Sequence, residues 1–224
     1  MERPCHRRHA PRRCRLRHRA RLRARQRSRP AGDPVSASVL LPAVARVAVP
    51  WKDGGGITRT IAAGPEGAGL DDFDWRLSMA EVRAAGAFSR FEGIDRHLAV
   101  LEGELALDIG GQPHGVGRGD APVTFAGDMP VTGAPVGGDV IDLNLMVRRG
   151  RAIGRLAPVT PAFTADPAAH GLILVFTAPG AVDFGGERIS AERFDAVRVD
   201  PTTWPAIGMD TAGPVFVAEI TGPA

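Results

Sequence analysis

Tyrosine is absent from this 224-residue chain, and cysteine occurs only twice, at Cys5 and Cys14. Both cysteines lie in an arginine-rich N-terminal segment, so the rest of the chain has neither a disulfide nor a thiol nucleophile. This distribution fits a reducing compartment, and we expect a cytoplasmic protein. The missing tyrosine excludes a phenolic general acid, and no G-x-S-x-G sequence offers a serine nucleophile on a strand-to-helix turn.

Long apolar runs are also lacking. No segment approaches the roughly 18 apolar residues that a membrane-spanning helix requires, so we predict no membrane partner. The stretch VSASVLLPAVARVAV follows the arginine-rich segment, but Pro42 and Arg46 interrupt it. Because no clean small-residue cleavage site follows, a twin-arginine signal is not favoured.

Positive charge is concentrated in the first 30 residues, which contain 13 arginines, no lysine and one acidic residue, a local charge of +12. Because the whole chain carries +3, residues 31–224 carry −9. An acidic body predicts no nucleic-acid partner for the folded part. The arginine block cannot bury a core, so we predict that residues 1–34 are a disordered tail that the body does not need for folding.

Three interpretations of this tail remain: a nucleic-acid arm, a targeting segment, or upstream DNA translated from a start codon assigned too early. We favour the third, and Val35 would then be an alternative start.

Residues 35–224 form short apolar runs separated by glycine and proline, with few helical patterns. HLAVLEGELALDI, DVIDLNLMV, GLILVFTA and PVFVAEI are examples. Such spacing is typical of an all-β protein.

The body also repeats itself. A displacement of 75 residues places residues 98–121 on residues 173–196 without a gap, with eight of 24 positions identical and Gly110 on Gly185. We therefore predict an internal duplication into two small antiparallel β-barrels or jelly rolls, at residues 35–155 and 156–224. Barrels of this size can hold one small ligand.

The segment PWKDGGGITRTI, residues 50–61, places three glycines between a lysine and an arginine. A P-loop requires its lysine after the last glycine, and a dinucleotide fingerprint requires a helix where this chain has a β-branched run. Two interpretations remain. The glycines form a plain hairpin corner, or they let the backbone approach a ligand and offer their N–H groups to an anion.

This segment resembles the HutD/Ves family of cupin-like proteins, together with FDWRLSMAEVRAAGAFSRFEGIDRHLAVLEGE, FAGDMPV and DLNLMVRRG in the same order and spacing. The resemblance covers residues 38–220. It implies a bicupin fold, a bacterial cytoplasmic protein and an association with histidine utilisation. Two positions depart from the family pattern, because Asp53 replaces the usual asparagine and Thr60 replaces the usual glutamate.

Most cupins bind a metal ion through a His-x-His pair, a glutamate and a later histidine. Here the corresponding GIDRHLAVLEGE offers only His97, with Glu102 and Glu104 near the turn, and the later half has no partnered histidine. Since a catalytic metal usually has three protein ligands, we predict no metal and no other cofactor.

Strand alternation indicates which polar side chains share a face. In DWRLSMA, Arg76 and Ser78 lie on one face, and in VIDLNLMVR, Asp142 and Asn144 do so. We predict that these residues and their cationic neighbours converge on one pocket of the first barrel. The complete predicted ligand-binding set is Trp51, Lys52, Asp53, Gly54, Gly55, Gly56, Arg59, Arg76, Ser78, Arg96, Asp142 and Asn144.

The cations of this set suit carboxylates, and its amide and carboxylate suit an amino or imide group. We therefore expect a small carboxylate or zwitterionic metabolite as partner, bound by a sensing or buffering protein. The resemblance suggests formylglutamate or urocanate. Two alternatives stay open: a metal-independent isomerase or hydrolase with Asp142 as general base, and a stress-related protein without a small ligand. The sequence also leaves a homodimer open.

Overall fold

The computed structural model describes residues 38–159, 162–184, 186–199 and 206–222, so the predicted tail, residues 1–34, lies outside them. Within these ranges every regular element is a β-strand except one 3-10 helix, Ala43–Ala45. This confirms the all-β prediction. None of the described helical segments has the length and apolarity needed to cross a membrane.

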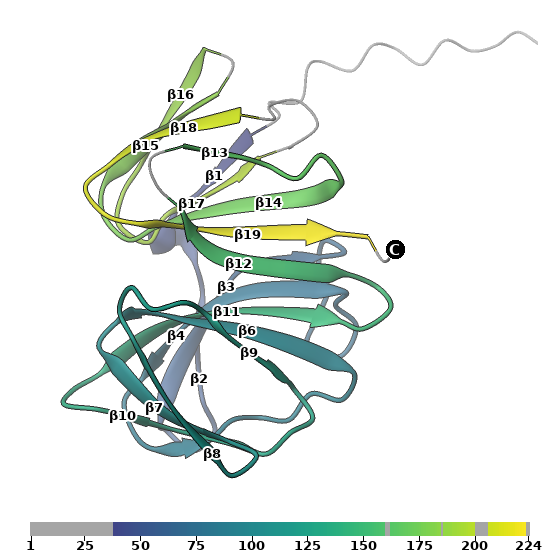
Figure 1. Ribbon diagram of the computed structural model, residues 1–224, viewed down its shortest axis with the longest axis vertical. Coiled ribbons are helices and arrows are strands. Elements are labelled where there is room, and N and C mark those ends of the chain that lie inside the picture. The colour runs from purple at the N-terminus through teal and green to yellow at the C-terminus, as the bar shows by residue number, and fades with distance from the viewer. Residues whose placement is uncertain (1–37, 160–161, 185, 200–205, 223–224) are drawn as a thin grey trace, which may run out of the picture. The chain divides into compact units, whose positions relative to one another are not determined.

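The first half forms two antiparallel sheets, labelled in Figure 1. The larger has the order β2 (Ala48–Pro50), β3 (Gly56–Gly64), β4 (Trp75–Val82), β11 (Val140–Arg148), β6 (Ile94–Glu102) and β9 (Val123–Ala126). The smaller has the order β5 (Gly86–Ala87), β10 (Val131–Pro135), β7 (Glu104–Ile109) and β8 (Gln112–Gly117). Leu98 and Val100 of the larger sheet share one buried cluster with Leu105 and Leu107 of the smaller. The two sheets therefore enclose a common core.

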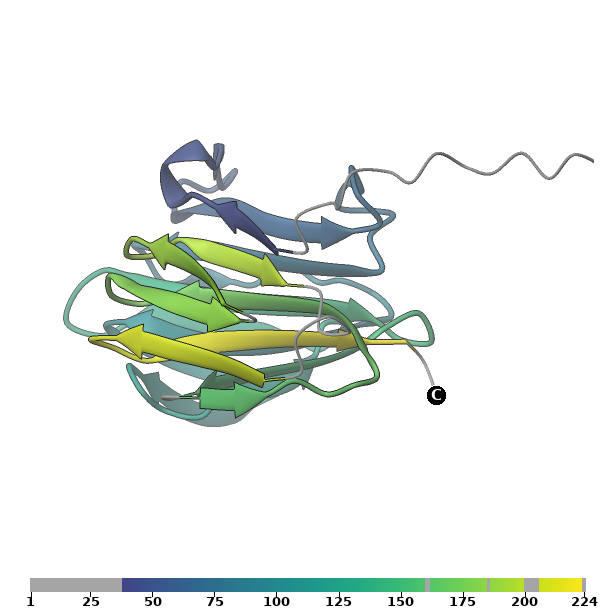
Figure 2. The same cartoon turned by 90° about the horizontal axis from the view of Figure 1, so that it is seen from above.

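The second half repeats this arrangement. Its larger sheet has the order β1 (Ser38–Leu41), β17 (Ala196–Val199), β14 (Ala169–Phe176), β19 (Val215–Thr221) and β12 (Ile153–Val159). Its smaller sheet has the order β13 (Ala162–Thr164), β18 (Ala206–Thr211), β15 (Gly180–Phe184) and β16 (Glu187–Ala191). Figures 1 and 2 both show the yellow β19 running beside green strands of this sheet. The core between the two sheets consists of aliphatic and phenylalanine side chains such as Leu174, Phe176 and Phe184.

The first half of the chain contributes one strand to the larger sheet of the second half. The N-terminal β1, which falls within the predicted first barrel, pairs with β17 at the far end of the chain, with Ser38 opposite Val199. β12 begins at Ile153 and pairs with β19, so the second-half sheet also starts before residue 156.

Strand positions follow the 75-residue displacement. β6 and β14 begin at residues 94 and 169, β10 and β18 at 131 and 206, and β11 and β19 at 140 and 215. Their partners correspond as well, since β11 pairs with β6 as β19 pairs with β14. These correspondences support the predicted duplication. The specific pairing of Gly110 with Gly185 involves a residue outside the described ranges.

Each strand of the larger first-half sheet has two different faces. Leu143, Leu145 and Val147 of β11 pack in a cluster with Ile173 and Phe216 of the second half, so their face joins the two halves. Successive side chains of a strand point to opposite faces, so residues 142, 144 and 146 point into the first-half barrel. This interior face carries the candidate site.

Candidate functional site

Three neighbouring strands bring the strongest candidates to the interior face. β11 lies between β4 and β6, and we call three residues directly opposite one another across these strands a rung. The three rungs are Arg76–Met146–Arg96, Ser78–Asn144–Leu98 and Ala80–Asp142–Val100. Because opposite residues share a face, five predicted residues lie together. We call this set the inner polar face: Arg76, Ser78, Arg96, Asp142 and Asn144.

Arg96 is held inside the barrel with only 5% of its surface exposed. Its guanidinium carbon lies 4.9 Å from the centre of the Phe88 ring and 5.2 Å from that of Phe125. Nε donates to Asn144 Oδ1 at 3.5 Å, and Nη1 donates to the Ser89 carbonyl at 3.5 Å. Burial lowers the pKa of this guanidinium to about 10, although the charge of Asp142 opposes the effect. Among the described residues no carboxylate forms an ion pair with it.

Arg76 lies on the same rung, across β11. Its Nη1 donates to Ser78 Oγ at 3.2 Å and its Nη2 to Thr60 Oγ1 at 2.8 Å, and burial lowers its pKa. Thr60 is the position where the family pattern usually has a glutamate. The hydroxyl accepts a hydrogen bond but brings no charge, so Arg76 also lacks an ion-pair partner within the described part of the chain.

Asp142 occupies the most apolar rung, between Ala80 and Val100, and is 2% exposed. Burial raises the pKa of its carboxyl to about 7, while the charge of Arg96 and a hydrogen bond with the backbone of Ala80 oppose the rise. Its Oδ1 has no hydrogen-bond partner. A buried acceptor without a donor is unusual in proteins and indicates strain or an unfilled function.

The glycine segment lies elsewhere, in the hairpin turn between β2 and β3. Trp51 N donates to the Gly56 carbonyl at 2.9 Å, and Gly54 N donates to the Trp51 carbonyl at 3.1 Å. Gly55 N donates to Asp53 Oδ1 at 3.0 Å. Since these bonds use the N–H groups of Gly54 and Gly55 within the turn, the geometry is that of a hairpin corner. Lys52 is exposed at this turn.

Backbone conformation and space explain why glycine occupies two of these positions. Gly54 has φ +74°, a conformation that side chains with a Cβ rarely adopt. At Gly56 a Cβ would lie 2.4 Å from the Glu81 carbonyl oxygen and 2.9 Å from the Trp51 ring. The tryptophan therefore packs directly on the glycine.

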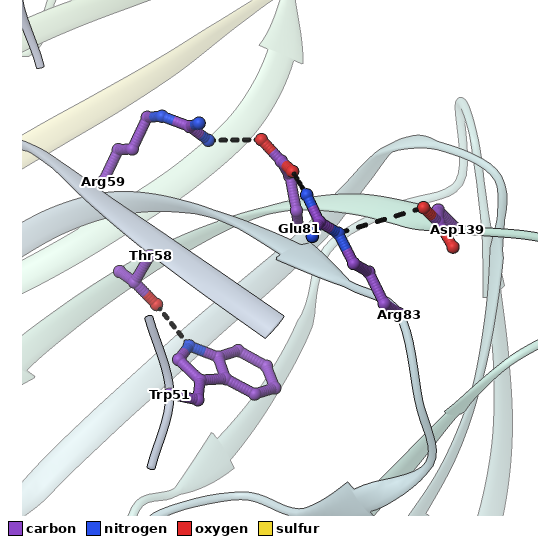
Figure 3. A network of polar contacts seen from close by, with 6 residues as sticks. All are labelled: Trp51, Thr58, Arg59, Glu81, Arg83 and Asp139. Atoms are coloured by element: carbon purple, nitrogen blue, oxygen red, sulfur yellow. Dashed lines mark hydrogen bonds and ion pairs between the residues drawn. The ribbon is translucent and has the colours of Figure 1, made fainter. Parts of the chain in front are cut away.

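Arg59 is not brought to the inner polar face. It lies opposite Met79, whose face joins the two halves, whereas Thr60 lies opposite Ser78. Figure 3 shows Arg59 paired with Glu81, which also receives a hydrogen bond from Arg83 at 2.6 Å. Hydrogen bonding by Arg59 is the main cause of the lowered Glu81 pKa. In the same view the Trp51 indole donates to Thr58 Oγ1 at 2.7 Å.

The residues present do not fit a cupin metal centre. His97 lies opposite Leu145, on the face that joins the halves, and its Nδ1 is 3.0 Å from Thr124 Oγ1. The described residues contain no cluster of three or more His, Cys, Asp or Glu side chains arranged to hold a metal ion. The inner polar face instead presents two guanidinium groups, which repel a metal cation.

Three contributors were not predicted as site residues: Phe88, Phe125 and Thr60. Phe125 lies in FAGDMPV, a segment that carries the family resemblance, but nothing in its spacing indicates contact with Arg96. A hollow of about 450 Å³ lies elsewhere, on the outer side of the smaller sheet beside Ala106 and Thr132, and its lining includes no residue of the inner polar face.

Comparison with known proteins identifies one matching family and several similar sequences. The HutD family model matches residues 43–217. An uncharacterized 21.2 kDa protein from the hutC 3′ region of Pseudomonas putida is 38% identical over 109 residues, 48% of this chain and 57% of that protein. The chain thus matches little more than half the length of this relative. Protein Ves of Citrobacter koseri is 34% identical over 146 residues, 64% of this chain and 74% of Ves.

A solved structure is similar over most of the described body. HutD from Pseudomonas fluorescens SBW25, in a formate condition, superposes with a TM-score of 0.72 and 30% identity, covering 84% of this chain and all of that one. This agreement shows that the described body has the fold of that HutD structure. Because the family model spans well over half of the sequence, the chain belongs to the HutD family.

Proposed function

We propose that the inner polar face binds a small carboxylate or zwitterionic metabolite, and that the protein senses or buffers this metabolite in histidine utilisation. The observation that carries the proposal is Arg96, an arginine with 5% of its surface exposed whose guanidinium forms no ion pair among the described residues. A buried charge is costly unless a partner or a ligand compensates it.

The chemistry of the face suits a carboxylate. Phe88 and Phe125 both lie against the Arg96 guanidinium, and a guanidinium fork can receive a carboxylate through two parallel hydrogen bonds. Arg76 adds a second cation from the opposite strand. Within an apolar barrel such bonds are stronger than in water because the surrounding dielectric is low.

The link to histidine utilisation comes from the relatives. The chain belongs to the HutD family, and the Pseudomonas putida relative is described by its position in the hutC 3′ region. Formylglutamate and urocanate are therefore the first candidates, and both carry a carboxylate.

The test measures binding of formate, urocanate and formylglutamate by calorimetry and thermal shift, with Arg96→Met as the variant. We expect Arg96→Met to lose roughly 2–5 kcal/mol of binding free energy, as truncated buried charge contacts do. Arg193→Met is the matched control, because Arg193 also lies over a phenylalanine, 4.3 Å from the Phe194 ring centre, but outside the inner polar face. Equal affinity of Arg96→Met and wild type, or binding of none of these acids, would contradict the proposal.

One observation favours a second function, that of a metal-independent isomerase or hydrolase. Asp142 has a pKa of about 7 and an unoccupied Oδ1, properties that suit a general base at neutral pH. Incubating any bound acid with the protein and following it by NMR would reveal turnover. Conversion that disappears in Asp142→Asn, with binding retained, would support an enzyme, and an unchanged spectrum would leave binding alone.

A further inference from the structure

We propose, on the basis of the function proposed above, that Asp142 makes the site select carboxylates that also carry an N–H or O–H hydrogen-bond donor. The ligand would place its carboxylate at Arg96 and its donor at Asp142 Oδ1. The ligand class is thus a short hydroxy, amino or amide acid rather than a simple carboxylate.

The rungs set the separation between the two ligand groups. Although Arg96 lies opposite Met146, its side chain extends along the sheet, because Nε reaches Asn144 Oδ1 at 3.5 Å. The guanidinium therefore lies near the Asn144 rung. Asp142 is two residues further along β11, which corresponds to about 7 Å. A carboxylate and a donor joined by three or four carbon atoms span this interval.

The protein satisfies Asp142 only in part, because the carboxyl bonds with the backbone of Ala80 while Oδ1 has no partner. Its rung neighbours Ala80 and Val100 have apolar side chains, and the adjoining rung positions Val82 and Val140 belong to the apolar barrel core. The side-chain oxygen of Asn144, on the same strand, accepts a hydrogen bond from Arg96. No described residue donates to Oδ1, so it remains a buried acceptor that the donor of a ligand can pair with.

This arrangement should make the site discriminate between acids with and without a hydrogen-bond donor. An acid without a donor leaves Oδ1 unpaired beside it, whereas an acid with a donor pairs with this oxygen. Sites that hold an unpaired buried polar group reject ligands lacking the complementary group far more strongly than apolar sites reject a missing methylene. The pKa of about 7 leaves Asp142 largely ionised at pH 8, where it acts as an acceptor.

The experiment compares matched acids with the full-length protein at pH 8 by calorimetry. The pairs are butanoate with 4-hydroxybutanoate, and pentanoate with 5-hydroxypentanoate. We expect the hydroxy acid of at least one pair to bind about tenfold or more tightly than its parent, the change typical of one hydrogen bond to a charged group. In Asp142→Ala, and in the isosteric Asp142→Asn as a second variant, this preference should fall at least severalfold.

The outcomes separate the two proposals. If the acids bind in an Arg96-dependent way but without preference for the hydroxy member, donor selection is wrong and the carboxylate site stands. If a preference persists unchanged in Asp142→Ala, another residue provides it and the inference also fails. If none of these four acids binds to the wild type, the inference fails, and the proposed function fails as well when formate, urocanate and formylglutamate also do not bind. Asp142→Asn, which keeps the shape of the side chain, decides the assignment to Asp142 if Asp142→Ala does not fold.

Discussion

Replacing Asp142 with asparagine should change how stability depends on pH. In the folded protein burial raises the pKa of Asp142 from the ordinary 3.8 to about 7. Between these pH values the native state holds a proton that the unfolded chain releases. The contribution of Asp142 to the free energy of unfolding is therefore fully present below about pH 4 and is lost as pH rises to about 7.

The size of this effect follows from the pKa difference. A shift of about three pH units corresponds to about 4 kcal/mol, since each unit is worth about 1.4 kcal/mol. Asparagine has the shape of the carboxyl but no titratable proton. Relative to wild type, Asp142→Asn should therefore gain up to about 4 kcal/mol of stability between pH 4 and pH 8, and nothing further above pH 8.

Urea unfolding followed by tryptophan fluorescence at pH 4.5, 6, 7 and 8 measures this difference. The comparison between variant and wild type removes the contribution of other groups with shifted pKa values, such as His97 and Glu81, because both proteins share them. Parallel stability curves, with a constant offset over the whole range, would refute the assignment of a raised pKa to Asp142.

Three further predictions concern the surroundings of the site. Gly56→Ala should lower the free energy of unfolding by about 1–3 kcal/mol, because the new Cβ meets the Glu81 carbonyl and the Trp51 ring. The control Gly115→Ala, whose Cβ would have nothing within 4 Å, should change the melting temperature little. Similar melting temperatures for the two variants would show that the turn adjusts to the new side chain. Arg59→Ala should leave the affinity for carboxylates unchanged. It should lower stability by at most about 1 kcal/mol, since the ion pair of Arg59 is partly exposed. Weaker binding in calorimetry would show that Arg59 belongs to the site. Phe125→Leu should weaken carboxylate binding by about 0.5–2 kcal/mol, because the Arg96 guanidinium loses one of its two rings, and an unchanged dissociation constant would show that the rings do not orient it.

Period-2 alternation was enough to predict much of the candidate site. It placed Arg76 with Ser78 and Asp142 with Asn144, because strand geometry alone determines which residues of one strand share a face. It could not determine which strands are neighbours or in what register they pair. Arg59 illustrates the limit, since only the pairing of Thr60 with Ser78 reveals that Arg59 points the other way.

Contacts between distant segments were equally invisible to the sequence. Phe88, directly after β5, and Phe125 of β9 meet Arg96 of β6 through the fold, and neither ring has a spacing relative to Arg96 that predicts the contact. The repeated apolar runs did predict all-β structure. The pairing of β1 with the second half was not predicted, because the four residues of this strand do not indicate which strand they pair with.

The pairing of β1 with the second half, and the apolar cluster to which both halves contribute, affect how the molecule unfolds. β1, at the start of the described chain, completes a sheet made by its last third, and the cluster that contains Leu145 and Phe216 draws side chains from both halves. Neither half keeps its full set of contacts when the other melts. We therefore expect denaturation as a single cooperative transition, and a chain divided near residue 150 should yield two fragments that recover structure only when mixed.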